Sequence, residues 1–136
     1  MLFTQKSEVD IHEMSPLALA FVGDAVLELL VRARLVGTTR LQPNRLHTVA
    51  THYVSAHAQN LELDIIEPML TDAEAAVLRR GKNASKATVA KHATVQEYRA
   101  STGFECLLGW LYLNGQLSRV QELFETLWQS FDPNEK

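Results

Sequence analysis

The segment from Ser15 to Leu35 constrains the fold more than any other part of the chain, because it is a long apolar stretch with a clear helical start. Ser15 can accept a hydrogen bond from a free N–H of the first turn, and Pro16 stands where a missing N–H costs nothing. The following residues are apolar on every side, which is typical of a helix surrounded by protein. We therefore expect a buried central helix.

Two carboxylates, Asp24 and Glu28, interrupt an apolar face of this helix that also holds Phe21 and Val31. An unpaired carboxylate on a buried face would cost several kcal/mol, so it must be protonated, salt-bridged or bound to a cation. Gly23 costs about 1 kcal/mol relative to alanine inside a helix, which predicts that another backbone comes close beside Asp24. The residues alone leave a core Asp–Arg pair and a metal site equally open.

Helical periodicity continues along the rest of the chain, with no strand alternation and no internal repeat, so the expected fold class is all-α. With 136 residues, the chain fits one domain, residues 1–136. Residues 1–14 are expected to form a loose N-terminal arm and residues 132–136 a tail. Further helices are predicted at residues 43–61, 64–70, 71–80, 94–113 and 117–131, with Gly81 as a stop and a basic loop at 82–92.

The composition, 46% hydrophobic and 21% charged, is that of an ordinary globular protein. The single cysteine, Cys106, lies in an apolar run and is interpreted as an inert buried thiol, which fits the reducing cytoplasm. The first ten residues lack the apolar core of a signal peptide, and no uncharged apolar run reaches the ~20 residues of a membrane span. We expect a cytoplasmic protein without a membrane segment.

The charge is unevenly distributed, although the net charge is −3. Nine of the 13 basic residues fall in two stretches without an acid. These are Arg32, Arg34, Arg40 and Arg45, followed by Arg79, Arg80, Lys82, Lys86 and Lys91. Such separation can give an acidic protein one positive face, which could hold a phosphate backbone without reading bases.

The segment from Phe104 to Leu113 resembles the first helix, since it is apolar on nearly every side and carries one acid, Glu105, with glycines nearby. If the two helices pack together, Asp24 and Glu105 could meet. Two such carboxylates, completed by waters, are what a hydrated Mg²⁺ requires. His47, His52 and His57 are not interpreted as metal ligands, because steps of five residues turn their rings apart on a helix.

These residues resemble a known family. The run from Phe21 to Leu29 looks like the signature helix of ribonuclease III domains, and Thr102 to Leu113 looks like their second acidic helix. The Arg79–Ala84 segment is similar to one in Mini-ribonuclease III, the short bacterial form without a double-stranded-RNA-binding domain. The chain is identified as a member of this family.

The resemblance implies a homodimeric, Mg²⁺-dependent endoribonuclease that cuts double-stranded RNA, with a stem of the large-subunit (23S) ribosomal RNA precursor as the usual substrate. Asp24 and Glu105 would be the catalytic and metal-binding acids. The RNA-binding residues would be Arg79, Arg80, Lys82, Asn83, Lys86 and Lys91. Two further acids of larger ribonuclease III proteins are replaced here by Ala20 and Thr102. Two rivals stay open: a duplex-RNA-binding dimer with little or no cleavage, and a helical scaffold.

Overall fold

A computed structural model describes residues 7–85 and 93–133, and the helices account for most of them. The element order is η1 (Ile11–Glu13), α1 (Pro16–Thr38), α2 (Pro43–Val54), α3 (Ala56–Ile66), η2 (Glu67–Met69), α4 (Asp72–Ala84), α5 (Val95–Leu113) and α6 (Leu117–Ser130). These described residues contain no strand, so the all-α prediction is confirmed.

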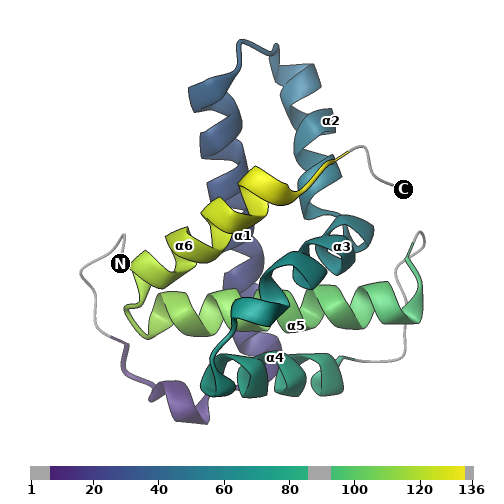
Figure 1. The fold of residues 1–136 in the computed structure, drawn as a ribbon. Helices are drawn as coiled ribbons and strands as arrows, with labels where there is room; N and C mark the ends of the chain where they lie inside the picture. The colour runs from purple at the N-terminus through teal and green to yellow at the C-terminus, as the bar shows by residue number, and fades with distance from the viewer. Residues whose placement is uncertain (1–6, 86–92, 134–136) are drawn as a thin grey trace.

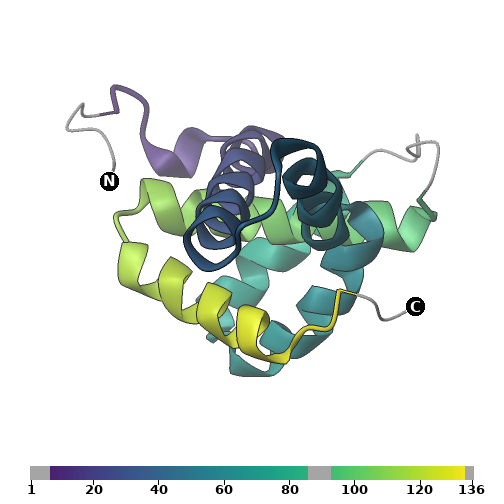
Figure 2. The same cartoon turned by 90° about the horizontal axis from the view of Figure 1, so that it is seen from above.

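Helix α5 lies at the centre of the fold (Figure 1). It makes its most extensive contacts with α1 and packs next against α4 and α3. The C-terminal half of α1 and helix α2 form a hairpin that projects away from α5, and Figure 2 shows the two helices side by side. The core is formed by apolar residues of every α-helix, among them Leu27, Phe104, Leu107 and Leu111.

Side chains that cap the first turn mark where several of the helices begin. Ser15 accepts a hydrogen bond from the Ala18 N–H, as predicted for the start of α1. Thr71 and Thr94 each begin a helix with a complete capping box, in which the threonine hydroxyl and a glutamate three residues later satisfy each other's backbone N–H groups.

The predicted single helix over residues 43–61 is wrong, because the chain turns at Ser55 and forms two helices, α2 and α3. Ser55 has extended backbone angles, and its hydroxyl accepts a hydrogen bond from the Ala58 N–H. The predicted short helix at 64–70 is also wrong. Helix α3 continues to Ile66, and the 3₁₀ turn η2 with Pro68 follows.

Gly81 does not end a helix, contrary to the prediction. Helix α4 continues to Ala84, and Gly81 is buried inside it, where an added Cβ would lie 2.6 Å from the Cys106 Cβ and 2.9 Å from the Gly103 Cα. Gly81 is therefore needed for close packing of α4 on α5. Residues 82–84 of the predicted basic loop are helical, and residues 86–92 lie outside the described residues.

The first helix is not buried on all sides. Four large apolar side chains of α1 are exposed: Leu17 (41%), Phe21 (82%), Leu29 (50%) and Val36 (66%). Asp24 is exposed as well, so its expected place on a buried face is wrong. Within the single chain, α1 packs on α5 with one side and presents a second apolar side outward.

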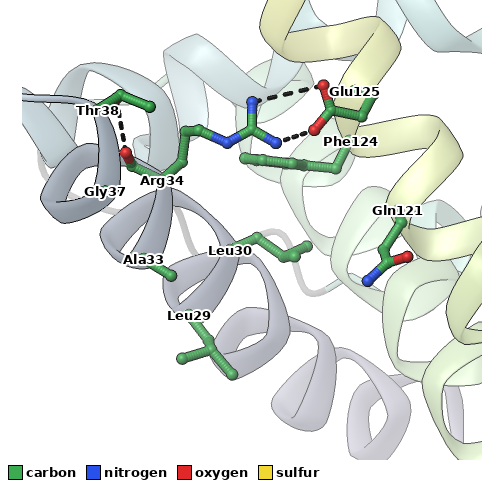
Figure 3. Close-up of a pocket in the computed structure, with 9 residues that line it drawn as sticks. All are labelled: Leu29, Leu30, Ala33, Arg34, Gly37, Thr38, Gln121, Phe124 and Glu125. Atoms are coloured by element: carbon green, nitrogen blue, oxygen red, sulfur yellow. Dashed lines mark hydrogen bonds and ion pairs between the residues drawn. The ribbon is translucent and has the colours of Figure 1, made fainter.

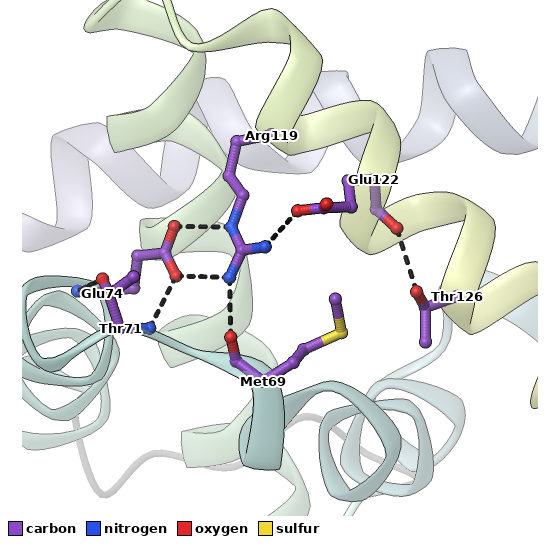
Figure 4. Close-up of polar contacts among 6 residues, drawn as sticks. All are labelled: Met69, Thr71, Glu74, Arg119, Glu122 and Thr126. Carbon is purple, nitrogen blue, oxygen red and sulfur yellow. Dashed lines mark hydrogen bonds and ion pairs between the residues drawn. The ribbon is translucent and has the colours of Figure 1, made fainter.

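Arg119 fastens α6 to the remainder of the fold (Figure 4). Its guanidinium donates to both carboxylate oxygens of buried Glu74, each at 2.8 Å, and to the Met69 carbonyl at 2.7 Å. The hydrogen bonds from Arg119 lower the pKa of Glu74 and so keep this buried carboxylate ionised. Among the described helices, none is both long and apolar enough to cross a membrane.

Candidate functional site

The candidate site lies where the backbones of α1 and α5 touch. A Cβ added to Gly23 would lie 1.6 Å from the Glu105 carbonyl oxygen, and one added to Gly109 would lie 1.9 Å from the Leu19 carbonyl oxygen. No side chain fits at either position, so both glycines are required for this contact. The close approach that the sequence predicted beside Asp24 is confirmed.

This contact brings the carboxyl groups of Asp24 and Glu105 together. Burial raises the pKa of Glu105, a hydrogen bond from Gln59 opposes this shift, and the neighbouring carboxyl groups of Asp24 and Glu28 raise the pKa further. Neither Asp24 nor Glu105 forms an ion pair within the part of the chain that the structure describes. With no cation beside it, Glu105 therefore resists ionisation, and a cation bound between the two carboxyl groups would favour its charged form.

Glu28 plays a different part from these two acids. Its Oε2 accepts a hydrogen bond from Arg32 Nε at 2.9 Å, one helical turn later on α1. Glu28 is half-buried, and its charge acts on Glu105 through space. The arginine already neutralises Glu28, which leaves Asp24 and Glu105 as the acids in need of a cation.

The positions of the two replaced acids face the interior. Ala20 and Thr102 are both 7% exposed. The Thr102 hydroxyl donates to the Tyr98 carbonyl oxygen at 3.0 Å and lies 3.4 Å from Ser85 Oγ, so its hydrogen is used within the fold. Among the described residues, no group of three or more His, Cys, Asp or Glu side chains could hold a metal ion. A cation here would have two protein carboxylates.

Gln59 is a site residue that the sequence did not reveal. Its side-chain nitrogen donates to Glu105 Oε2 at 3.0 Å and to the Val54 carbonyl oxygen at 2.9 Å. The prediction treated residues 43–61 as one continuous helix, which fixed the direction of each side chain around its axis. The turn at Ser55 starts a new helix, α3, in which the Gln59 side chain points in a different direction. Recognising Ser55 as a helix cap was the signal that could have placed Gln59 inside.

The predicted RNA-binding residues that the structure describes are on the last turns of α4. Arg79, Arg80 and Asn83 are exposed, whereas Lys82 is half-buried. Arg79, Lys82 and Asn83 line a groove of about 410 Å³ between α3, α4 and α5. Lys86 and Lys91 lie outside the described residues.

Arg99 of α5 fixes the C-terminal end of α4. Its Nε donates to the Lys82 carbonyl at 3.1 Å, and one terminal nitrogen donates to Asn83 Oδ1 at 3.2 Å. A cation is favourable at a helix C-terminus, where carbonyl groups lack intrahelical partners. The groove beside this end therefore carries Arg99 in addition to Arg79 and Lys82, while Asp64 and Glu67 line its opposite side.

Comparison with known proteins gives a consistent result. The family model for the ribonuclease III domain matches residues 17–116. A Mini-ribonuclease 3 of Enterococcus faecalis is 46% identical over 116 residues, covering 84% of this chain and 88% of its own length. One from Brevibacillus brevis is 42% identical, covering 89% and 92%. A crystal structure of a Fusobacterium nucleatum protein superposes with a TM-score of 0.82 at 28% identity, covering 90% of this chain and all of that one.

Proposed function

The chain belongs to the ribonuclease III family and is a ribonuclease III-like endoribonuclease, and from this premise we propose that it cleaves double-stranded RNA with Mg²⁺ held by Asp24 and Glu105. The observation that carries the proposal is the glycine contact between α1 and α5, which brings these two carboxyl groups together. Both would be metal ligands and catalytic residues.

The donor set fits a hydrated magnesium ion. Mg²⁺ in proteins commonly keeps several waters and binds one or two carboxylates, and this site offers two that lack an ion pair among the described residues. A bound Mg²⁺ would activate a water molecule as nucleophile and offset the charge of the phosphate. Asp24 is exposed at the surface, where RNA would bind, and Glu105 accepts a hydrogen bond from the side chain of the buried Gln59.

Duplex RNA would be held by the basic residues near the C-terminal end of α4. We assign this role to Arg79, Arg80, Lys82, Asn83, Lys86 and Lys91. Cations at this position would contact phosphates and therefore hold RNA without base selection. The exposure of Arg79, Arg80 and Asn83 supports the assignment.

The active form would be a homodimer. Exposed Phe21 is on the same helix as an apolar groove of about 410 Å³ lined by Val22, Val26 and Leu29 of α1 together with residues of α5 and α6. A two-fold axis places the same surface on both subunits, so Phe21 of each copy could enter the groove of the other.

Figure 3 shows the surface next to this groove, toward the C-terminal half of α1. A second hollow of about 430 Å³ shares Leu29, Leu30 and Gln121 with the first. Its far side is fixed by Arg34, which pairs with Glu125 and places its guanidinium 5.2 Å from the Phe124 ring centroid. The two hollows thus lie next to each other along α1 and α6. The first is lined mainly by apolar residues, and the second also by the Arg34–Glu125 pair.

The substrate and the compartment follow from the family resemblance. We propose a stem in the 23S ribosomal RNA precursor as the natural substrate and the cytoplasm as the location. The unpaired, buried thiol of Cys106 fits a reducing compartment. We further propose that residues 1–136 form a single domain, since α5 contacts α1, α3, α4 and α6.

Replacing either acid tests the function. Asp24→Asn and Glu105→Gln should each lower Mg²⁺-dependent cleavage of a long RNA duplex on the order of 100-fold or more. RNA binding, measured by filter retention without metal, should change little, because neither residue contacts phosphate directly. Cleavage at the wild-type rate by either variant would contradict the assignment.

The same assay separates the alternative function. The alternative is a dimer that binds duplex RNA and cuts it poorly. It is supported by the two carboxylates of this site, since larger ribonuclease III proteins have four and this chain has Ala20 and Thr102 at the other two positions. Tight duplex binding with no Mg²⁺-dependent cleavage by the wild-type protein would support that alternative. Failure to bind duplex RNA at low salt would favour a helical scaffold.

A further inference from the structure

Gln59 is a polar side chain in the interior of the fold, at 1% exposure. It is on the first turns of α3, and the turn at Ser55 directs it toward α5. An uncharged amide in such a place is costly unless it forms hydrogen bonds. The two hydrogen bonds donated by its side-chain nitrogen therefore indicate why this position holds a glutamine.

The two acceptors determine the orientation of the amide. One is the Glu105 carboxylate and the other is the Val54 carbonyl, at the last residue of α2. A carbonyl oxygen and an ionised carboxylate only accept hydrogen bonds, so the Gln59 nitrogen with its two hydrogens faces both groups. The amide oxygen points away and is buried without a hydrogen-bond partner among the described residues. Carboxylate, hydroxyl and aliphatic side chains cannot supply two donors from one atom at this position.

The Val54 bond anchors the amide to the backbone. Val54 ends α2, so its carbonyl has no intrahelical partner and takes the first hydrogen of the Gln59 nitrogen. The second hydrogen is then directed at Glu105 Oε2. The Glu105 carboxylate is thereby tied to the junction of α2 and α3, although it belongs to α5.

We infer that Gln59 is a positioning residue, which uses the anchored amide to hold the Glu105 carboxylate in the orientation that binds the metal ion beside Asp24. This inference rests on the proposed function. A long glutamate side chain can adopt several rotamers, and hydrogen bonds from neighbouring groups select one of them. Gln59 does not contact RNA in this role.

The first test replaces the amide with a side chain of similar length. Gln59→Met keeps an unbranched chain and removes both donors. Mn²⁺ binding to the RNA-free protein, measured by electron paramagnetic resonance, should weaken about 10- to 100-fold. Cleavage at saturating duplex RNA should fall over a similar range, while the Kd for RNA without metal stays unchanged.

Leu63→Val is the matched control, because Leu63 is buried on the same helix at 2% exposure and has an apolar role. It should lower the melting temperature but leave Mn²⁺ affinity and cleavage rate as in the wild type. If Gln59→Met resembles this control, with Mn²⁺ affinity and cleavage within twofold of wild type, the inference is overturned and the proposed function stands. A wild-type protein without metal-dependent cleavage would instead overturn both.

A second measurement does not depend on the folding of a variant. The side-chain amide signals of Gln59 in a proton–nitrogen correlation spectrum should shift when Mg²⁺ is added, with the same midpoint as the Mg²⁺ dependence of cleavage. Signals of Gln121, an exposed glutamine on α6, serve as the internal reference and should not shift. Gln59 signals that stay unchanged through saturation would overturn the inference.

Discussion

Glu62 carries a carboxyl group in the interior of the fold. Its side chain is on α3 at 0% exposure, and neither carboxyl oxygen has a hydrogen-bond partner among residues 7–85 and 93–133. Burial raises the pKa of Glu62 from its ordinary value of 4.5 to about 9, because the charged form loses its hydration. The group is therefore protonated in the folded protein at neutral pH.

This protonation makes the free energy of unfolding depend on pH. Between pH 4.5 and pH 9, the carboxyl is protonated when folded and ionised when unfolded, so unfolding releases a proton. Stability from this group is fully present below pH 4.5 and falls as pH rises, by up to about 1.4 kcal/mol per pH unit.

Chemical denaturation of wild type and Glu62→Gln at pH 5, 6, 7 and 8 measures the effect. The amide has the same shape and does not titrate, so the stability difference should move in favour of the variant as pH rises. A difference that stays constant across this range would show that Glu62 is not a buried neutral acid.

Particular residues show what the sequence could and could not predict about the site. Asp24 and Glu105 could be paired in advance because two apolar helices each carry an acid and glycines that permit close packing. At the contact itself these glycines are Gly23, next to Asp24, and Gly109, one helical turn after Glu105. Gln59 and Glu62 could not be placed, since both follow the turn at Ser55. When Ser55 is interpreted as part of one continuous helix, Gln59 is placed away from the apolar face, whereas the structure buries it.

At the scale of elements, the glycine contact between α1 and α5 sets the distance between the two acids. Gly23 and Gly109 let the backbones touch, and their added Cβ atoms would meet backbone atoms, which cannot rotate away. Helices packed over larger side chains have axes 8–10 Å apart. We infer that a side chain at Gly23 would move Asp24 away from Glu105.

Gly23→Ala should therefore lower the free energy of unfolding by more than about 3 kcal/mol and reduce the cleavage rate. The added methyl group would clash with backbone atoms of α5, which cannot move aside as a flexible side chain could. Gly37→Ala is the control on the same helix, because no atom in the described part of the chain lies within 4 Å of an added Cβ there. That change should stabilise by about 0.5 kcal/mol through helix propensity. Thermal unfolding of both variants measures this, and equal effects would contradict the packing argument.

Helix boundaries were predictable where a side chain caps the helix. Ser15, Thr71 and Thr94 each mark a start that the structure confirms. Gly81 misled the prediction, because glycine ends many helices and only tertiary contact shows that this one packs against α5. The role of a glycine inside a helix depends on a partner that local sequence does not contain.

At the scale of the whole molecule, the all-α class followed from periodicity, but the surroundings of α1 did not. An all-round apolar helix is expected to be enclosed by protein. In the single chain, Phe21 at 82% exposure and Val36 at 66% are left uncovered. The apolar pattern of α1 and its exposed side chains are consistent if a second copy of the chain covers the side of α1 that carries Phe21.

The proposed homodimer is tested by removing the side chain that we propose lies at the centre of its interface. Phe21→Ala should weaken dimerisation by about 2 kcal/mol, roughly 30-fold in the dimer Kd, because a large aromatic at the centre of an interface contributes strongly. Val9→Ala is the matched control, an exposed apolar residue near the N-terminus, outside the α1 groove, that should leave the Kd unchanged. Sedimentation equilibrium over nanomolar to micromolar concentrations measures both. A wild-type protein that is monomeric at micromolar concentration and fully active would contradict the proposed assembly, since duplex RNA would then need only one subunit.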